Sequence, residues 1–315
     1  MSIILVTGAS GFVGSYALPE LIDAGHSIVA LVRDERAREK VLRRLAPAQR
    51  EKVEFRTGDV TRPDSLPAAM LGVDAVLHLV AIPRDWDGGR SLARINTGGT
   101  RNVVDAAKAA GVRRFVHEGA LAVQDRAELH YASSKARAER YVAESGLDWT
   151  ILKPSLMWGP RDGFFNILAG LVRMSPVVVP VPGDGKARFQ PLAATDMGRV
   201  FRLVFERPET IGKAFDLGGP TYWTYTEIVH EVARGLGTRR TAIPMPLPII
   251  RLVAGLSELV RLPFPVATDQ LRQLALDNIG PLDSVEREFG FAPRAMDGNL
   301  GYLRRKLRDQ EPTAG

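Results

Sequence analysis

Hydrophobic and polar residues alternate in blocks along the first half of the chain. Short runs rich in β-branched residues, each followed by turn-forming residues, are separated by longer segments in which apolar residues recur at helical spacing. This pattern predicts six strands, at residues 3–7, 27–33, 53–56, 75–79, 114–117 and 149–153. It predicts helices at residues 12–24, 36–45, 95–110 and 131–145.

Apolar strands that alternate with helices are typical of a parallel sheet covered on both faces. We therefore predict an α/β fold in which residues 1–155 form a Rossmann-type doubly wound parallel sheet. Three of the predicted helices are followed by a glycine, at Gly25, Gly111 and Gly146, where the left-handed backbone that ends a helix costs glycine nothing.

The composition changes after Ser155, where prolines become frequent and the alternation ends. Residues 156–308 are expected to form a smaller, mixed α/β substrate-side region, interleaved with the first domain. Helices are predicted at residues 196–206 and from Thr224 or Thr226 to Gly235, with a strand end and turn at residues 216–220. Residues 309–315 are predicted to form a flexible tail.

Composition excludes several classes of site. Hydrophobic residues make up 45% of the 315 residues and charged residues 25%, which is the usage of a globular protein and not of a disordered chain. The chain has no cysteine, so disulfides, thiolate metal sites and cysteine nucleophiles are excluded. A chain without cysteine fits the reducing cytosol.

Charge and hydropathy argue against nucleic acid as a partner and against a membrane span. The 42 Lys and Arg residues exceed the 36 Asp and Glu residues by 6, without the dense basic stripe that contacts a phosphate backbone. No basic segment precedes the first apolar strand, so we expect no secretory signal and a cytoplasmic protein. The most apolar later stretch, residues 244–265, is interrupted by charges and prolines and is not a transmembrane helix.

The strongest motif follows directly after the first predicted strand. It consists of Thr7, Gly8, Ala9, Ser10, Gly11, Phe12, Val13 and Gly14. Gly8 permits a tight turn, Gly11 lets the backbone approach a pyrophosphate, and Gly14 allows close packing of the helix. The helix N-terminus adds free N–H groups and partial positive charge. A strand, a glycine-rich turn and a helix in this order predict an NAD(P)-binding loop, and the alternative is an ordinary glycine-rich turn.

This loop and further segments in a fixed order resemble the short-chain dehydrogenase/reductase superfamily, over the whole chain except its last few residues. The further segments are Gly58-Asp59-Val60, Leu79-Val80-Ala81, Asn96 with Gly99-Thr100, Tyr131-Ala132-Ser133-Ser134-Lys135 and Lys153-Pro154-Ser155. The resemblance implies that Asp59 and Val60 contact the adenine ring and that Val80 and Ala81 lie in the cofactor-side loop. It places Asn96 on a helix that flanks the active site, and it implies that Pro154 and Ser155 meet the nicotinamide.

The chain is most similar to the extended and atypical members, of the NAD-dependent epimerase/dehydratase type. Five segments resemble the branch that contains the nucleotide-binding accessory subunit of respiratory complex I and its bacterial relatives: Phe115-Val116-His117, Phe189-Gln190-Pro191, Leu262-Pro263-Phe264-Pro265, Asp269-Gln270-Leu271 and Asp277-Asn278. This resemblance implies an NADH dehydrogenase-like oxidoreductase or an epimerase-like enzyme.

The end of the second predicted strand bears on the choice of nucleotide. An acidic residue there holds the ribose 2′-OH of NAD, whereas an arginine accommodates the 2′-phosphate of NADP. Val32 occupies the expected carboxylate position, and Arg33 follows it. NADP(H) is therefore favoured over NAD(H). In the alternative, Arg33 is solvated and Asp34 contacts the ribose.

Tyr131 and Lys135 lie four residues apart at a predicted helix start, so their side chains share one face. An ammonium nearby favours a phenolate and is expected to lower the pKa of Tyr131. The resemblance assigns Tyr131 as the proton donor or acceptor and Lys135 as the ribose anchor that tunes it. The alternative is a chance pair on a solvated helix.

Members of the superfamily place a serine or threonine after the fifth strand, and this chain has Gly119 there. Thr97 or Ser155 can help only if the fold brings it close; otherwise water fills the role. Either the site is a degraded serine-tyrosine-lysine site, or the protein binds nucleotide without fast turnover. Whether the chain is an enzyme is therefore left open.

Two alternatives to an oxidoreductase are a nucleotide-binding, sensing or assembly protein and a nucleotide-sugar epimerase or dehydratase. The second would direct basic residues such as Arg161, Lys186, Arg188 and Arg199 towards a diphosphate. The histidines lack paired metal-ligand spacing, so no metal site is predicted. The amphipathic segment at residues 249–262 can lie on a membrane or on a respiratory complex, although a lid or core helix is the commoner role. The sequence does not indicate the oligomeric state.

Overall fold

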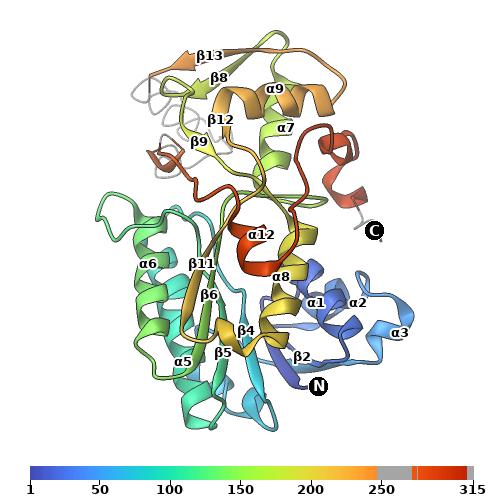
Figure 1. The fold of residues 1–315 in the computed structure, drawn as a ribbon, viewed down its shortest axis with the longest axis vertical. Helices are drawn as coiled ribbons and strands as arrows, with labels where there is room; N and C mark the ends of the chain where they lie inside the picture. Colours follow the sequence, from blue (N-terminus) through green and yellow to red (C-terminus); the bar gives the residue numbers. More distant parts are fainter. Residues whose placement is uncertain (247–271, 275, 311–315) are drawn as a thin grey trace.

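The computed structural model describes residues 1–246, 272–274 and 276–310 (Figure 1). Its centre is a seven-stranded sheet with the strand order β11-β6-β5-β4-β1-β2-β3, in which all neighbouring strands are parallel. The strands are β1 (Ile3–Thr7), β2 (Ser27–Val32), β3 (Val53–Thr57), β4 (Ala75–His78), β5 (Arg114–Glu118), β6 (Asp148–Pro154) and β11 (Lys213–Leu217). The predicted doubly wound parallel sheet is confirmed.

The seventh strand, β11, comes from beyond Ser155 and pairs with β6 at the edge of the sheet. The sequence pattern predicted only its end and the following turn. Phe215 and Leu217 are buried, while Lys213 and Ala214 are exposed. An edge strand buried at alternate positions lacks the continuous apolar run that identifies a central strand.

Helices cover both faces of the sheet, as Figure 1 shows. On one face lie α5 (Gly99–Ala109) and α6 (His130–Ala143), which share an apolar core with the sheet. On the other face lie α1 (Gly14–Asp23) and α8 (Ala194–Glu206), with a core of their own. Short helices α2 (Glu35–Leu42) and α3 (Pro47–Arg50) precede β3. The helix expected at residues 95–110 is in two parts, a π-helical segment Ala93–Gly98 followed by α5.

A second core lies beyond the carboxyl ends of the strands, in the upper part of Figure 1. It is built from α7 (Phe164–Met174) and α9 (Tyr225–Gly235), the latter capped by Thr224. Three two-stranded sheets accompany them: β7 (Met157–Trp158) with β10 (Leu192–Ala193), β9 (Arg188–Phe189) with β12 (Trp223–Thr224), and β8 (Val178–Pro182) with β13 (Thr241–Met245). The remaining elements are α4 (Arg90–Leu92), α12 (Ser284–Phe289) and 3-10 turns at Pro63–Ser65, Ala68–Met70, Pro208–Thr210, Leu300–Arg304 and Leu307–Asp309.

Gln310, near the start of the predicted flexible tail, is held more firmly than predicted. Gln310, in the segment expected to be a flexible tail, is only 1% exposed, and its side-chain amide donates to Oδ1 of Asn166 at 2.7 Å. Residues 311–315 of that tail lie outside the described residues.

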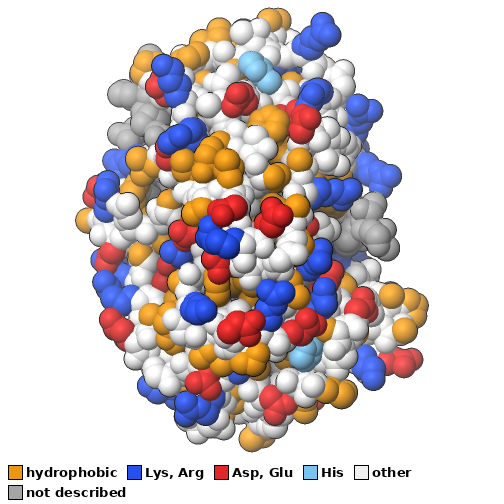
Figure 2. Space-filling view, in the orientation of Figure 1, with side chains coloured by type: hydrophobic (Ala, Val, Ile, Leu, Met, Phe, Trp, Pro, Cys, Tyr) orange, Lys and Arg blue, Asp and Glu red, His pale blue; other side chains and the backbone are white. Residues whose placement is uncertain are grey.

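Acidic and basic side chains are interspersed over the face of the molecule seen in Figure 2. Across the described ranges, no helix has both the length and the apolar character needed to cross a bilayer. The amphipathic segment at residues 249–262 lies outside the described residues.

Candidate functional site

The glycine-rich turn connects β1 to α1 and requires glycine at two positions. Gly8 has a φ of +76°, and a Cβ there would lie 2.9 Å from the carbonyl carbon of Leu79. A Cβ on Gly14 would lie 2.6 Å from the carbonyl oxygens of Gly8 and Ala9. The turn is therefore wound so tightly against itself and against the end of β4 that side chains at these positions are excluded.

The N-terminus of α1 is left without a side-chain cap. Val13 at the N-cap position makes no capping hydrogen bond, and the first turn holds no acidic residue. The neighbouring helix α2 is capped by Asp34 instead. The N–H groups of Ser15 and Tyr16 bond to the carbonyl oxygens of Phe12 and Val13, at 3.1 and 3.0 Å. An anion such as a pyrophosphate would therefore meet the N–H groups that precede Ser15, at the positive end of the helix.

Arg44, which the sequence analysis did not identify, is hydrogen-bonded to the same loop. Nη1 of Arg44 donates to the carbonyl oxygens of Ser10 and Gly11, at 2.7 and 2.9 Å. Arg44 follows α2 and lies more than thirty residues from the loop, so no local motif identifies it. It places a positive charge directly beside the turn.

The predicted cofactor residue Thr7 faces inward. It is fully buried, its Oγ1 lies 2.7 Å from Nδ1 of His78, and it accepts a hydrogen bond from the N–H of Leu79 at 3.3 Å. Nε2 of His78 lies 3.0 Å from the hydroxyl of Thr100. Thr7 therefore holds β1 and β4 in register beneath the turn, and burial lowers the pKa of His78 to about 3.

At the end of β2 the side chains of the adjacent residues Arg33 and Asp34 have different surroundings. Oδ1 of Asp34 accepts a hydrogen bond from the N–H of Ala37 at 2.7 Å, so this carboxylate caps α2. Burial raises the pKa of Asp59, but the hydrogen bonds from Thr61 and, to a lesser extent, the charge of Arg33 lower it below its ordinary value. Arg33 itself is exposed.

The segments that follow β3 and β4 are tied to the helices beside them. The side chain of Val60 is buried, and its carbonyl oxygen accepts a hydrogen bond from Nδ2 of Asn102. Val80 and Ala81 directly precede Ile82, whose N–H donates to Oδ1 of Asn96 at 2.8 Å.

Asn96 lies in the π-helical segment and connects the loop after β4 to α6. Its Nδ2 donates to the carbonyl oxygen of Ile82 at 3.1 Å and to Oγ of Ser134 at 3.0 Å. π-helical turns are rare and are frequently found at functional sites. Here the side-chain amide of Asn96, in the π-helical turn, is hydrogen-bonded both to the cofactor-side loop and to the helix that carries Tyr131.

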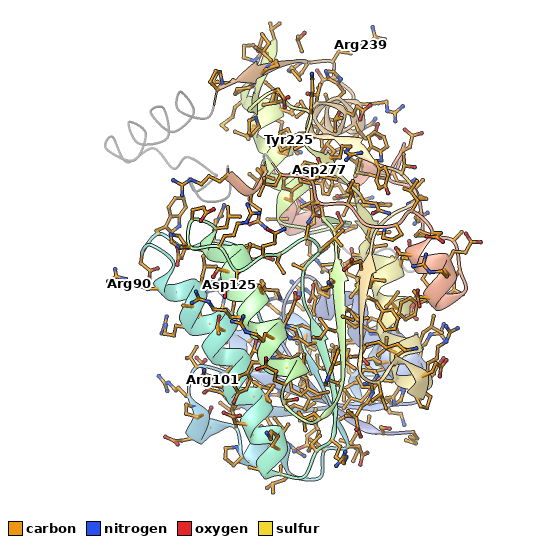
Figure 3. All side chains as sticks on the ribbon, turned by 60° about the vertical axis from the view of Figure 1, so that its left-hand side comes forward. Arg90, Arg101, Asp125, Tyr225, Arg239 and Asp277 are labelled. Atoms are coloured by element: carbon orange, nitrogen blue, oxygen red, sulfur yellow. The ribbon has the colours of Figure 1, made fainter. Side chains whose placement is uncertain are left out.

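The loop that leads into α6 is held by Asp125, which Figure 3 shows beside this helix. Asp125 accepts hydrogen bonds from Oγ of Ser133 at 2.5 Å and from Nε of Arg137 at 3.0 Å. It also pairs with Arg140. These contacts fix where α6 begins and so position its first turn.

Tyr131 and Lys135 lie on α6 beside the carboxyl end of β5. Lys135 is 3% exposed, and its Nζ donates to the carbonyl oxygen of Glu118. In the sheet β5 neighbours β4, and β4 neighbours β1. The pair and the glycine-rich turn therefore both lie at the carboxyl ends of these three neighbouring strands. The fold thus brings the two predicted sites together.

The expectation that Lys135 lowers the pKa of Tyr131 is wrong for this structure. Burial raises the pKa of Tyr131, and the carboxylates of Glu118 and Glu139 raise it further. Burial also raises the pKa of Glu118, to about 7, against the attraction of Lys135. Burial lowers the pKa of Lys135 itself. The side chains around the phenol therefore favour its neutral form.

The two hydroxyls offered as replacements for a serine at position 119 are used elsewhere. Oγ1 of Thr97 donates to the carbonyl oxygen of Ser134 at 2.9 Å. Oγ of Ser155 donates to Oδ1 of Asn278 at 2.6 Å. Neither is free to take the place of a hydroxyl at Gly119.

Ser155 and Pro154 belong to the junction between the sheet and the second core. The N–H of Leu121 donates to the carbonyl oxygen of Pro154 at 2.9 Å, and Nδ2 of Asn278 donates to the carbonyl oxygen of Leu121 at 2.7 Å. Asn278 and Ser155 are 123 residues apart. The family resemblance includes Asp277-Asn278, but no sequence pattern near Asn278 predicts its contact with Ser155.

Three of the four basic residues considered for a diphosphate have other partners. Nη2 of Arg161 donates to Oγ of Ser15 at 2.9 Å. Arg188 pairs with Asp277 at 2.6 Å, at the boundary of the second core seen in Figure 3, and the guanidinium of Arg199 lies 4.1 Å from the ring centre of Phe291. Each of these three arginines thus contacts another side chain of the same chain.

Comparisons with known proteins indicate an NAD(P)H-binding domain. A family model described as NAD(P)H-binding matches residues 8–162, which include the glycine-rich turn and the Tyr131 and Lys135 pair. The chain is 28% identical to a 3β-hydroxysteroid dehydrogenase/Δ5→4-isomerase of Mycobacterium tuberculosis, over 92% of this chain and 86% of that protein. It is 24% identical to the mitochondrial NADH-ubiquinone oxidoreductase 40 kDa subunit of Neurospora crassa, over 91% and 75%.

The fold is shared with solved structures. An NADPH-dependent quinone oxidoreductase of Escherichia coli, solved with NADPH, superposes with a TM-score of 0.73 at 22% identity, covering 96% of this chain and all of that one.

Proposed function

Because this chain is an atypical member of the short-chain dehydrogenase/reductase superfamily with an NAD(P)H-binding domain, we propose that it is an oxidoreductase that reduces a carbonyl group with NADPH. The observation that carries the proposal is the position of Tyr131 and Lys135 at the carboxyl end of β5, the same end of the sheet as the glycine-rich turn. A proton donor and an anion-binding turn could therefore contact the same ligand.

The residues fit a dinucleotide along its length. The uncapped N-terminus of α1 and the backbone of Ser10 and Gly11 would hold the pyrophosphate. Asp59 and the loop at Val80 and Ala81 would flank the adenosine half. Lys135 would hold the nicotinamide ribose, and the backbone at Pro154 and Ser155 would lie beside the nicotinamide.

The proposed preference for NADP(H) rests on Arg33 and Asp34. Arg33 is exposed at the end of β2, where a guanidinium can meet a 2′-phosphate. Asp34 already accepts the N–H of Ala37, which supports the assignment of its carboxylate to the helix cap and not to a ribose.

When bound, the nucleotide supplies a hydride to the carbonyl carbon. Tyr131 supplies the proton to the carbonyl oxygen, and its neutral phenol suits this role. Asn96 keeps the loop after β4 and the first turns of α6 in a fixed relation. Gly119 contributes no hydroxyl to orient the carbonyl, so we expect turnover to be slow.

The experiment follows NADPH consumption with a panel of small ketones, aldehydes and quinones. Tyr131→Phe should reduce turnover by about 10²- to 10⁴-fold while leaving nucleotide binding unchanged, as for a positioned proton donor. Tyr141→Phe is the matched control, because Tyr141 lies on the same helix and donates to Asp105 at the surface. Equal activity of Tyr131→Phe and wild type would overturn the proposal.

A second function, nucleotide binding without turnover, is favoured by one observation. Gly119 has no hydroxyl, and both Thr97 and Ser155 are engaged elsewhere. Tight NADPH binding together with no consumption of NADPH across the whole panel would favour this sensing or assembly role. Contact with a membrane or with a respiratory partner belongs to the same proposal.

A further inference from the structure

Arg44 contacts two consecutive carbonyl oxygens of the glycine-rich turn. Its Nη1 donates to the carbonyl oxygen of Ser10 at 2.7 Å and to that of Gly11 at 2.9 Å. Nη1 of an arginine carries two hydrogens, so both are used on the backbone of the turn. This end of the guanidinium therefore acts on the turn itself and has no hydrogen left for a ligand.

The backbone that carries Arg44 is held in place by the end of α2. The N–H of Arg44 donates to the carbonyl oxygen of Val41 at 3.0 Å. Val41 and Leu45, on either side of Arg44 in the chain, are buried in the apolar core that also contains α1. The side chain of Arg44 thus extends to the turn from a fixed position.

The two contacts of Arg44 set the direction of the N–H groups in the turn. A planar trans peptide points its C=O and its N–H in opposite directions. The peptide between Ser10 and Gly11 shows this arrangement, because its oxygen accepts from Arg44 while its N–H donates to the carbonyl oxygen of Gly8 at 2.8 Å. In the next peptide Arg44 holds the carbonyl oxygen of Gly11, so the N–H of Phe12 is directed away from Arg44.

The N–H of Phe12 is available to a ligand. Among the described residues, none accepts a hydrogen bond from the N–H of Phe12, Val13 or Gly14. Gly11 is exposed and Phe12 and Val13 are only partly buried, so this part of the turn is accessible. These residues also lie within the segment that matches the NAD(P)H-binding family model. Their N–H groups are the donors that a pyrophosphate would meet.

Gly11 makes the peptide that carries the Phe12 N–H easy to rotate. Without a Cβ, glycine adopts backbone angles that are closed to other residues, so the peptide that follows it can turn over at little cost. A rotated peptide would present the carbonyl oxygen of Gly11, instead of the N–H of Phe12, to the anion, and the two would repel each other. The glycine that permits close approach therefore needs a contact that fixes its peptide, and Arg44 provides one.

We propose that Arg44 is a positioning residue for the nucleotide: by holding the carbonyl oxygens of Ser10 and Gly11, it keeps the N–H of Phe12 directed at the pyrophosphate. Arg44 raises the affinity for the nucleotide without bonding to it. This role rests on the proposed function in one respect, that a nicotinamide dinucleotide binds at the glycine-rich turn. It is independent of any reaction at Tyr131.

A lysine at position 44 separates this role from simple attraction between charges. Arg44→Lys keeps the positive charge, but its ammonium is carried on a shorter side chain and does not reach the two carbonyl oxygens from the same backbone position. Arg44→Met removes the charge as well. Arg43→Met, at the exposed neighbouring arginine, is the matched control, and circular dichroism checks that each variant is folded.

Fluorescence titration gives the Kd of NADPH for each variant. We expect Arg44→Lys to weaken binding by about 5- to 10-fold, the effect of losing roughly one hydrogen bond to the ligand. Arg44→Met should weaken binding at least as much, and Arg43→Met should bind as wild type does. An unchanged NADPH affinity in folded Arg44→Lys would overturn the inference, because charge alone would then account for any effect of Arg44.

A second measurement follows the Phe12 amide directly and applies to the wild type even if a variant does not fold. The protein is labelled with ¹⁵N-phenylalanine, and the Phe12 signal is the one missing from Phe12→Leu. Saturating NADPH should move the Phe12 amide proton downfield, as expected for a hydrogen bond to phosphate, and should move it less in Arg44→Lys. An Arg44 that served stability alone would leave this response as in wild type. A wild-type Phe12 amide that does not respond to NADPH overturns the inference.

Failure of the proposed function gives a different result. If wild type binds neither NADPH nor NADH, the nucleotide site at the turn is wrong, and the role of Arg44 is lost with it. If wild type binds NADPH but consumes none with any carbonyl substrate, the oxidoreductase is wrong, while the effects of Arg44 on the Kd and on the Phe12 amide remain.

Discussion

Oγ1 of Thr7 lies 2.7 Å from Nδ1 of His78, which joins the ends of the two strands that carry the glycine-rich turn and the cofactor-side loop. The hydroxyl of Thr100, 3.0 Å from Nε2 of His78, donates to the carbonyl oxygen of Asn96 at 2.6 Å. Its oxygen is then the acceptor for an Nε2–H, which leaves Nδ1 to accept from Thr7. A neutral imidazole satisfies this buried network, and a charged one does not.

The network predicts a loss of stability in acid. Burial lowers the pKa of His78 to about 3 in the folded protein, whereas an unfolded histidine titrates near 6.5. Between these values the unfolded state binds the extra proton, so the free energy of unfolding falls as pH falls from 6.5 towards 3. His78→Gln should reduce this dependence by up to about 1.4 kcal/mol per pH unit.

Urea unfolding at pH 7 and pH 5 measures this dependence. The exposed His230→Gln is the matched control and should behave as wild type. An acid sensitivity that is the same in His78→Gln and in wild type would show that His78 does not titrate as described. Other groups that titrate in this range, Glu118 among them, are common to all three proteins and cancel in the comparison.

The contact between Gly119 and Glu139 predicts that their substitutions are coupled. Gly119→Ser must displace the Glu139 carboxylate from the N–H of Ala120, which should cost about 1–3 kcal/mol of the free energy of unfolding. In a Glu139→Ala background the serine should cost less. Urea unfolding of the wild type, both single variants and the double variant gives the coupling energy. Strictly additive effects would contradict the overlap.

Asp34→Ala tests whether Asp34 acts as the cap of α2 or contacts the ribose of the nucleotide. Loss of the Ala37 hydrogen bond should lower the free energy of unfolding by about 1 kcal/mol, because Asp34 is the cap of α2. NADH and NADPH affinities should stay as they are. A loss of NADH affinity at unchanged stability would instead assign Asp34 to the ribose.

Arg33→Ala tests the preference for NADPH. Removing a charge-assisted phosphate contact should weaken NADPH binding by about 1.5–3 kcal/mol, roughly 10- to 150-fold in Kd, and leave NADH binding unchanged. Arg43→Ala, which removes an equal charge from the exposed end of α2, is the control. Fluorescence titration of both nucleotides measures the effect, and equal affinities of wild type and Arg33→Ala for NADPH would rule out the contact.

Local sequence was sufficient for the parts of the site that lie in one strand, turn or helix. The glycine-rich turn lies where its pattern predicted, and Tyr131 and Lys135 share a face of α6 as their spacing predicted. Both follow from chain geometry over fewer than ten residues. The strands with long apolar runs were also predicted to within one or two residues.

Contacts between distant segments were not predictable in this way. The pKa of Tyr131 depends on Glu118, which lies on another element, and on Glu139, whose carboxylate lies where a side chain at position 119 would be. Arg44 reaches the glycine-rich turn from beyond α2. In each case the decisive group is supplied by tertiary packing, which a strand or helix pattern does not contain.

Binding of NADPH at the glycine-rich turn is tested most directly by fluorescence titration of wild type and Gly11→Val. A Cβ on Gly11 already lies 3.0 Å from the carbonyl oxygen of Gly8, and the valine methyl groups would enter the path of a pyrophosphate. Gly170→Val, at a glycine of α7 with open space around it, is the control, and circular dichroism checks that each variant is folded. We predict that wild type and Gly170→Val bind NADPH and that folded Gly11→Val does not at concentrations that saturate the wild type. Retained affinity in folded Gly11→Val would show that NADPH does not bind at this turn.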